Sequence, residues 1–179
     1  MINGADDASL VARAREQDTA AFETLVRRYS GPAYRIALRI AGPADASDAA
    51  QEAFITAWRR IHEIRAGQAF AAWLYRIVTT RALNMARAHG PQGSIDEDLL
   101  PAARSGDPEE QALADGLRTA LARALSTLTP EQRACWVLRE VEGFSYDEIA
   151  DITQASPDAV RGRIHRARGR LAEELMAWR

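Results

Sequence analysis

The chain has 179 residues, enough for one domain or two small ones, with a slightly acidic net charge of −2 and 47% apolar residues. No apolar run approaches the roughly 20 residues of a membrane-spanning helix, and the polar, acidic N-terminus differs from a secretory signal, so we expect a cytoplasmic protein without membrane insertion. The single cysteine, Cys135, excludes an internal disulfide and a multi-cysteine zinc site, and we expect a buried structural thiol rather than a redox switch.

Residues 1–90 are predicted to form a helical domain. Apolar residues in 22–29 recur at the i, i+3, i+4 and i+7 spacing of an amphipathic helix. Gly31-Pro32 is expected to break or bend that helix, and Gly42-Pro43 to stop it. Because no segment of the chain shows the sustained alternation of a strand, the sequence predicts an all-α fold.

Residues 46–62 are predicted to form a helix with two different faces. One face is apolar, and the other carries Asp48, Gln51, Glu52, Ile55 and Arg59. A solvated polar face is one interpretation, and a docking face for a protein partner is the other. Ile55 favours docking slightly, because interfaces combine apolar anchors with a charged rim.

A loop is predicted at residues 63–69 and a further helix at residues 70–88. The start of this helix is dense in aromatic residues and is flanked by arginines, a combination that suits unstacked bases and their phosphates. Phe70, Trp73 and Ile77 also have the spacing of core residues. Both interpretations stay open on this evidence.

Residues 91–112 are predicted to be a flexible acidic linker between two helical domains. The stretch contains several glycines and prolines, and residues 93–116 carry seven acids against one arginine. The C-terminal domain is therefore expected to span residues 113–179.

The C-terminal domain has the pattern of a helix-turn-helix. Residues 129–139, 145–152 and 156–171 each open with a Ser or Thr that can cap a helix, and the last two are separated by a tight turn. Residues 156–171 carry five arginines against one acid, although the whole chain is acidic. This segregation of charge points to a nucleic-acid surface on the last helix.

Three motifs, in this order, resemble those of the extracytoplasmic-function (ECF) sigma factors, of the sigma-70 family of RNA polymerase subunits. The stretch Asp45-Ala-Ser-Asp-Ala-Ala-Gln-Glu-Ala-Phe-Ile-Thr-Ala-Trp-Arg-Arg is similar to the polymerase-docking segment. Phe70-Ala-Ala-Trp-Leu-Tyr-Arg-Ile is similar to the adjoining promoter-melting segment. Residues 128–133, 143–150 and 156–168 are similar to the C-terminal domain of that family.

The resemblance implies a mechanism and a set of contact residues. The N-terminal domain would dock on the largest subunits of core RNA polymerase through Asp48, Gln51, Glu52 and Ile55. It would also open the −10 element, with a base pocket formed by Ile64, Arg65 and Gln68 and a strand-tracking helix that presents Trp73, Arg76, Thr80, Asn84 and Arg87. The C-terminal domain would read the −35 element through Ser156, Asp158, Arg161, Gly162, Arg163, His165 and Arg166.

The resemblance also implies partners, and the chain departs from the family at a few positions. Promoter DNA and an anti-sigma factor are expected partners, and the free chain is expected to be a monomer. Gly162 stands where a serine is common, and His165 replaces a residue that is often apolar or aromatic. These departures leave the recognised promoter sequence open.

Two other classes of function are weighed against the sigma factor. A stand-alone helix-turn-helix regulator would explain residues 129–171 but not the docking helix, and it requires a dimer and a palindromic operator. A purely protein-binding adaptor would leave five arginines on one helix without a role. An enzyme is not expected, because there is no glycine-rich phosphate loop, no metal-ligand spacing and no nucleophile–base pair, so no catalytic residue, cofactor or metal is predicted.

Overall fold

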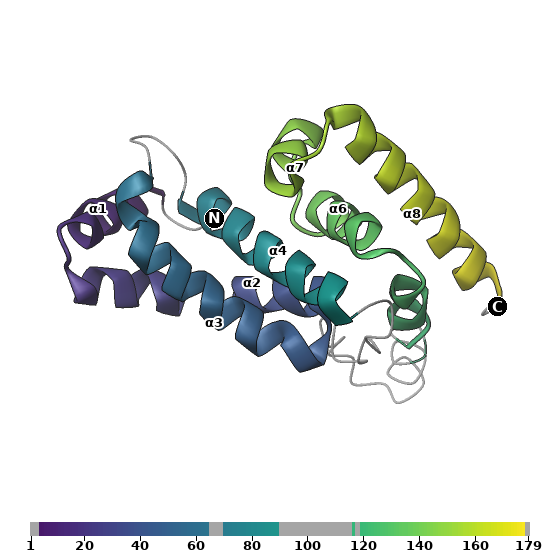
Figure 1. Cartoon of the computed structure of the whole chain (residues 1–179), viewed down its shortest axis with the longest axis horizontal. Coiled ribbons are helices and arrows are strands. Elements are labelled where there is room, and N and C mark those ends of the chain that lie inside the picture. Colours follow the sequence, from purple (N-terminus) through teal and green to yellow (C-terminus); the bar gives the residue numbers. More distant parts are fainter. Residues whose placement is uncertain (1–3, 65–69, 90–115, 117–118, 178–179) are drawn as a thin grey trace, which may run out of the picture.

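In the computed structural model, which describes residues 4–64, 70–89, 116 and 119–177, every element is helical (Figure 1). The expected all-α fold is confirmed. The elements are α1 (Gly4–Arg15), α2 (Thr19–Ala41), α3 (Pro43–Arg60), the 3-10 turn η1 (Ile61–Glu63), α4 (Phe70–His89), α6 (Pro130–Glu140), α7 (Tyr146–Thr153) and α8 (Pro157–Ala177), and residues 119–126 are also helical.

In the N-terminal half, α2, α3 and α4 pack on one another around a shared core. Asp18 caps α2 by accepting a hydrogen bond from the Ala21 amide at 3.1 Å. Gly42 separates α2 from α3 with a φ of 89°, a conformation that glycine adopts without strain, and Pro43 opens α3. Of the break or bend predicted at Gly31-Pro32, the break is wrong, because α2 runs through Pro32 as one helix.

In the C-terminal half, the predicted caps and turn are confirmed. Thr129 and Gln132 form a capping box at the start of α6, and Ser145 and Glu148 form a second one at the start of α7. The turn after α7 is closed by Gln154 in the left-handed conformation, with a φ of 53°. Apolar residues recur along α8 at spacings of three and four, which predicts a buried stripe of Val160, Ile164, Ala167, Leu171 and Leu175. The first four are buried, and Leu175, near the end of the helix, is only partly buried.

The two halves pack against each other through one continuous core. α6 lies against α2 and α4, and α7 lies against α4, so that α6, α7 and α8 form a second layer beside α4 (Figure 1). Leu125, Leu128 and Ala134 belong to the same buried cluster as Ile40. The sequence predicted two domains, 1–90 and 113–179, but not this contact, and the predicted linker at 91–112 lies outside the described residues.

The helices in the described part of the chain include none that is both long and apolar enough to cross a membrane.

Candidate nucleic-acid and protein interfaces

The outer face of α3 presents the predicted docking residues together. The inner face is built from small side chains, Ala46, Ala49, Ala50, Ala53 and Ala57, which lets α3 approach its neighbours closely. Asp48, Gln51 and Glu52 are exposed, and Ile55 keeps 43% of its surface in solvent among them. Glu52 also lies 3.7 Å from Arg81 of α4. The arrangement is an acidic patch with an exposed apolar side chain at its C-terminal end.

Two of the predicted −10 residues, Ile64 and Trp73, lie in the core instead of on the surface. Trp73 is 7% exposed and packs on Phe70, with ring centroids 6.0 Å apart, while Phe70 and Ile77 are also buried. The core interpretation of these three residues is therefore confirmed. Ile64 is 2% exposed, so neither Ile64 nor Trp73 can reach a DNA strand in this structure. Arg65 and Gln68 lie outside the described residues.

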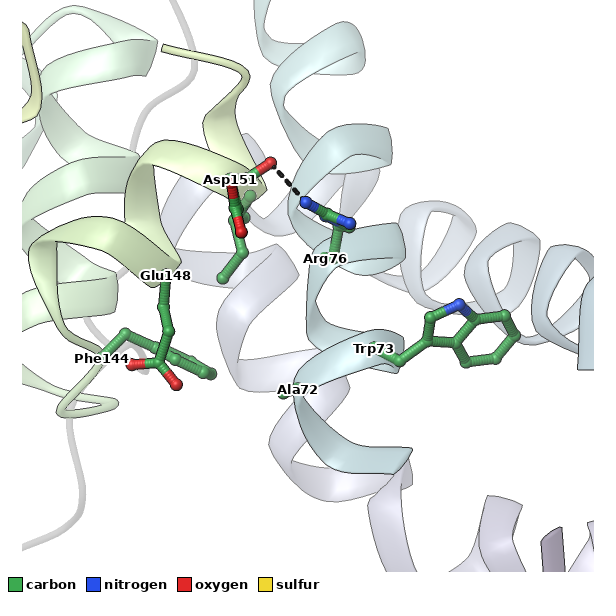
Figure 2. A pocket seen from close by; sticks show the side chains of 7 residues that line it. Ala72, Trp73, Arg76, Phe144, Glu148 and Asp151 are labelled. Atoms are coloured by element: carbon green, nitrogen blue, oxygen red, sulfur yellow. Dashed lines mark hydrogen bonds between the residues drawn. The ribbon is translucent and has the colours of Figure 1, made fainter. Parts of the chain in front are cut away.

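The other predicted −10 residues follow one edge of α4. Thr80 and Asn84 are exposed in the middle of this edge. At its two ends lie Arg76, which donates a hydrogen bond to the Asp151 carbonyl at 2.9 Å, and Arg87, whose Nε lies 2.7 Å from Glu131 Oε1 (Figure 2 shows the first). Partial burial of Glu131 works against its ionisation, but the hydrogen bond from Arg87 holds the pKa of Glu131 below its usual range.

A small cavity of about 150 Å³ lies where α4 meets α7 (Figure 2). Arg76 and Trp73 contribute to it from α4, and Phe144, Glu148 and Asp151 from the C-terminal half. Phe144 also packs edge-on against Tyr75, with ring centroids 6.2 Å apart. The edge of α4 that carries the predicted −10 residues is thus partly covered by the C-terminal half of the same chain.

Two buried arginines reinforce this contact, and the sequence did not reveal either of them. Arg39 lies 3.5 Å from Glu142, and its Nε is buried without a hydrogen-bond partner. Burial lowers the pKa of Arg39 and raises the pKa of Glu142. Arg133 is 4% exposed and donates to the carbonyls of Leu125, Leu128 and Ile40, and burial lowers its pKa to about 10. The sequence feature that could have pointed to Arg39 is its position as a charged residue inside an otherwise apolar stretch.

Most of the predicted −35 residues lie on the side of α8 opposite its buried stripe, namely Asp158, Arg161, Gly162, His165 and Arg166, whereas Ser156 precedes the helix and Arg163 lies beside the stripe. Ser156 caps the helix by accepting a hydrogen bond from the Ala159 amide at 3.2 Å. Exposed side chains follow, namely Asp158, Arg161, His165 and Arg166, while Gly162 and Arg163 are half-buried. Asp158 and Arg161 form an ion pair, which raises the pKa of Arg161.

The side chain of Arg166 occupies the space beside Gly162. The Arg166 guanidinium lies over Gly162, so that a Cβ added at Gly162 would lie 3.3 Å from Arg166 Nη1. Nearer the C-terminal end of α8, Arg168 pairs with Glu140 at 2.6 Å and Arg170 donates to the Thr127 carbonyl at 2.8 Å. The first turns of α8 therefore present the side chains that extend away from the domain.

Comparisons with known proteins agree with this arrangement of two halves. The family model described as Sigma-70 region 2 matches residues 25–91, and the one described as Sigma-70, region 4 matches residues 118–171. The chain is 36% identical over 172 residues to the ECF RNA polymerase sigma-E factor of Escherichia coli K12, covering 90% of each chain. It is 32% identical to the protein of the same name from Haemophilus influenzae, covering 94% of this chain and 95% of that one.

Two solved structures share the fold. One is CnrH in complex with the cytosolic domain of CnrY, with a TM-score of 0.68 and 28% identity, covering 96% of this chain and 98% of that one. The other is the sigma factor RpoE of Bartonella quintana in complex with the anti-sigma factor NepR, with a TM-score of 0.66 and 23% identity, covering 88% of this chain and 98% of that one.

Proposed function

Because the chain belongs to the extracytoplasmic-function sigma factors of RNA polymerase, we propose that three separate surfaces of the chain contact core polymerase, the −10 element and the −35 element. The protein is a transcription initiation factor and not an enzyme. It binds core RNA polymerase and promoter DNA. The proposal concerns which residues make each of these contacts.

The outer face of α3 is the polymerase-docking surface. Asp48, Gln51 and Glu52 supply a polar and acidic rim, and the exposed Ile55 beside them supplies an apolar anchor. An interface of this kind excludes water around the anchor while the charged rim fixes its orientation. The small residues on the inner face of α3 hold the helix close to the core, so the patch is presented on a rigid support.

The exposed edge of α4 binds the non-template strand of the −10 element. Arg76 and Arg87 meet phosphates, while Thr80 and Asn84 lie between them on the same edge. Arg65 and Gln68, in the segment before α4, form the pocket for a flipped base. Flipping costs a few kcal/mol per base, which these contacts must offset. Ile64 and Trp73 support the pocket from within the core, because both are buried.

The first turns of α8 read the −35 element in the major groove, in the way of a helix-turn-helix recognition helix. Arg161 and Arg166 contact base edges, with Asp158, Gly162 and His165 beside them on the exposed side. Ser156 places the start of α8 where its amides can meet a phosphate. Arg163 lies closer to the domain and is assigned to a backbone contact.

An anti-sigma factor is the third partner that we propose. Support comes from the similar structures, in which CnrH is bound to the cytosolic domain of CnrY and RpoE is bound to the anti-sigma factor NepR. The free chain is proposed to be a monomer, because polymerase rather than a second copy supplies the other anchor on the promoter.

The grouping of Asp48, Gln51, Glu52 and Ile55 on one exposed face carries the docking proposal. Its test is the affinity of labelled protein for core RNA polymerase. We expect the double variant Asp48→Ala/Glu52→Ala to bind at least about tenfold more weakly, a loss of about 1.4 kcal/mol.

A matched control removes two exposed acids from another surface of the same half, in the variant Glu16→Ala/Glu23→Ala. This control should bind polymerase as the wild type does. An equal loss of affinity in the two double variants would show that polymerase binding depends on the net charge of the chain and not on the outer face of α3. No polymerase binding by the wild type, with specific duplex binding retained, would favour the stand-alone regulator.

A further inference from the structure

We propose that Glu140, at the end of α6, withholds Arg168 of α8 from DNA phosphates and so lowers the affinity of the free chain for duplex DNA of any sequence. This inference rests on the proposed function, because it takes the exposed face of α8 as a duplex-binding surface. It adds to that function a residue that sets the non-specific affinity without itself contacting the promoter.

Arg168 lies on the same face of α8 as side chains that are proposed to read the −35 element. Asp158, Arg161, His165 and Arg168 follow one another at spacings of three and four residues, and all four are exposed. Residues with this spacing share one face of a helix. Arg168 therefore extends from the same face as Arg161, about two turns further along α8.

This position suits a contact with the DNA backbone. The major groove is about 12 Å wide, and two helical turns advance about 10 Å along the helix axis. When the first turns of α8 lie in the groove, a cation two turns further on lies near the phosphates that border it. Arginine binds phosphate in the same forked, charge-assisted geometry that it uses for carboxylates. By position and by chemistry, Arg168 is therefore suited to bind a phosphate.

A carboxylate already occupies the guanidinium of Arg168. Its Nη2 donates to Glu140 Oε1 at 2.6 Å, and this hydrogen bond is the main reason why the pKa of Arg168 is raised. Glu140 belongs to a different helix, so the pair holds the Arg168 side chain against the end of α6. A phosphate that binds Arg168 has to displace this carboxylate and then lie close to its negative charge.

The Glu140 pair differs from the other ion pair on this face of α8. Asp158 and Arg161 are partners within one helical turn, and the Asp158 side chain is 86% exposed. An exposed pair of this kind is weak and gives way readily to another ligand. The Glu140 side chain is only 34% exposed. Arg161 is thus available to DNA, whereas Arg168 is held back.

The residue before Glu140 fixes the end of α6. Arg139 donates to the Phe144 carbonyl at 2.9 Å, and its guanidinium lies over the Tyr146 ring, 4.9 Å from the ring centroid. These contacts join the last turn of α6 to the start of α7. Glu140 is therefore presented to α8 from a fixed backbone, where it competes with any phosphate that approaches Arg168.

The test measures the affinity of the full chain for a fluorescein-labelled duplex of mixed sequence, by anisotropy at several salt concentrations. Each phosphate that a cation neutralises steepens the slope of log affinity against log salt by about 0.9. Glu140→Gln keeps the shape of the side chain but frees Arg168, so we expect one further phosphate contact and a slope steeper by this amount. The loss of affinity between about 50 and 200 mM salt should then be about 3.5-fold larger than for the wild type.

The change has to depend on Arg168. Arg168→Gln alone should keep the wild-type slope, because Arg168 is withheld in the wild type, and Glu140→Gln/Arg168→Gln should return to that slope. Glu173→Gln is the matched control, since it removes one exposed acid from α8 and changes the net charge of the chain by the same amount. It should also keep the wild-type slope.

Promoter selectivity separates this role from a structural one. A phosphate contact carries no sequence information. Glu140→Gln, with polymerase, should therefore keep the wild-type ratio of transcription from promoters with and without substitutions in the −35 element. A changed ratio would overturn the proposal, because it would mean that Glu140 orients α8.

An unchanged slope for Glu140→Gln, with wild-type helical circular dichroism, would also overturn the proposal. So would a steeper slope that persists in Glu140→Gln/Arg168→Gln, or an equal change in Glu173→Gln. If Glu140→Gln loses helical content, Glu140→Ala takes its place under the same criteria. Failure of the proposed function is seen separately, as duplex binding and −35 discrimination that are both unchanged in Arg161→Ala.

Discussion

Arg161 is the side chain of α8 that we expect to contribute most to −35 recognition. It is exposed near the start of the helix, where it forms an ion pair with the still more exposed Asp158. A bidentate arginine–guanine pair contributes about 1–3 kcal/mol of discrimination between bases. Arg161→Ala should therefore lose −35 discrimination by this amount while binding core polymerase normally.

The measurement compares transcription from promoters with single substitutions in the −35 element. Arg168→Ala is the control on the same helix, because Arg168 already bonds Glu140. Loss of polymerase binding by Arg161→Ala would contradict the assignment of roles to the two halves.

Gly162 is expected to set the position of Arg166. An added Cβ would lie 3.3 Å from Arg166 Nη1, so Gly162→Ala should push the guanidinium to a new position and change which −35 bases are preferred. Replacing glycine by alanine inside a helix should also raise the free energy of unfolding by about 1 kcal/mol.

Gly169→Ala separates these two effects, because nothing lies within 4 Å of a Cβ at that position of the same helix. Both variants should gain stability in chemical denaturation, but only Gly162→Ala should select different promoters from a library. An unchanged preference in Gly162→Ala would show that Arg166 does not depend on the glycine.

Individual site residues could be predicted from the sequence only in part. The exposed set on α3 and α8 follows from helical periodicity, since a residue opposite an apolar stripe faces solvent. Ile64 and Trp73 have motif positions that suggest DNA contact, yet both pack in the core. A motif gives the position of a residue, whereas exposure also depends on neighbours that are remote in sequence.

At the scale of elements, the cap of α7 is expected to carry part of the stability of the helix-turn-helix. Ser145 accepts a hydrogen bond from the Glu148 amide at 3.2 Å, and the Glu148 carboxylate accepts one from the Ser145 amide at 2.8 Å. Losing such a cap costs about 1 kcal/mol. Ser145→Ala should lower the free energy of unfolding by that amount in urea denaturation.

The control for the cap is Ser47→Ala, at an exposed position inside α3. Alanine is the better helix former there, so the free energy of unfolding should stay equal or rise. A comparable loss in both variants would mean that the effect at Ser145 does not come from capping.

The elements were predictable because their signals are local. Caps, turns and apolar stripes each involve residues within one helix, and the structure contains them where the pattern put them. The exception is α2, which continues through Pro32. A proline inside a helix costs about 3 kcal/mol, but Tyr29, Ala33 and Ile36 are fully buried around it, and this packing outweighs the local rule.

At the scale of the whole molecule, the contact between the halves could not be predicted. It depends on pairs such as Arg39 with Glu142 and Arg133 with the Ile40 carbonyl, which are about a hundred residues apart in the chain. Only the structure brings Glu131 and Glu148 to the arginines of α4.

The contact between the two halves should depend on pH through Glu142, which lies 3.5 Å from Arg39. Burial raises the pKa of Glu142 above its ordinary value of 4.5, against the attraction of Arg39 and Arg35. The chain with its halves in contact then binds the proton more tightly than a chain with its halves apart, so the contact weakens as pH rises from 4.5 through the raised pKa. The neighbouring Tyr75, with a pKa raised to about 12 by burial, stays neutral throughout.

Glu131 changes the strength of the contact between the halves in the opposite direction, and it does so in a lower pH range. Its pKa is held below 4.5 by Arg87, with a smaller contribution from Arg163, so the contact between the halves also weakens as pH falls below that value. The radius of gyration should therefore pass through a minimum near the ordinary glutamate pKa. Glu142→Gln should abolish the change above the minimum, and persistence of that change would rule out Glu142 as its source.

The most direct test of the whole account is run-off transcription with core RNA polymerase and this protein on a library of promoters from its own genome. We predict specific transcripts that disappear with Asp48→Ala/Glu52→Ala and shift to other promoters with Arg161→Ala. Absence of any transcript that depends on the protein, while it still binds specific duplex DNA by itself, would contradict the account.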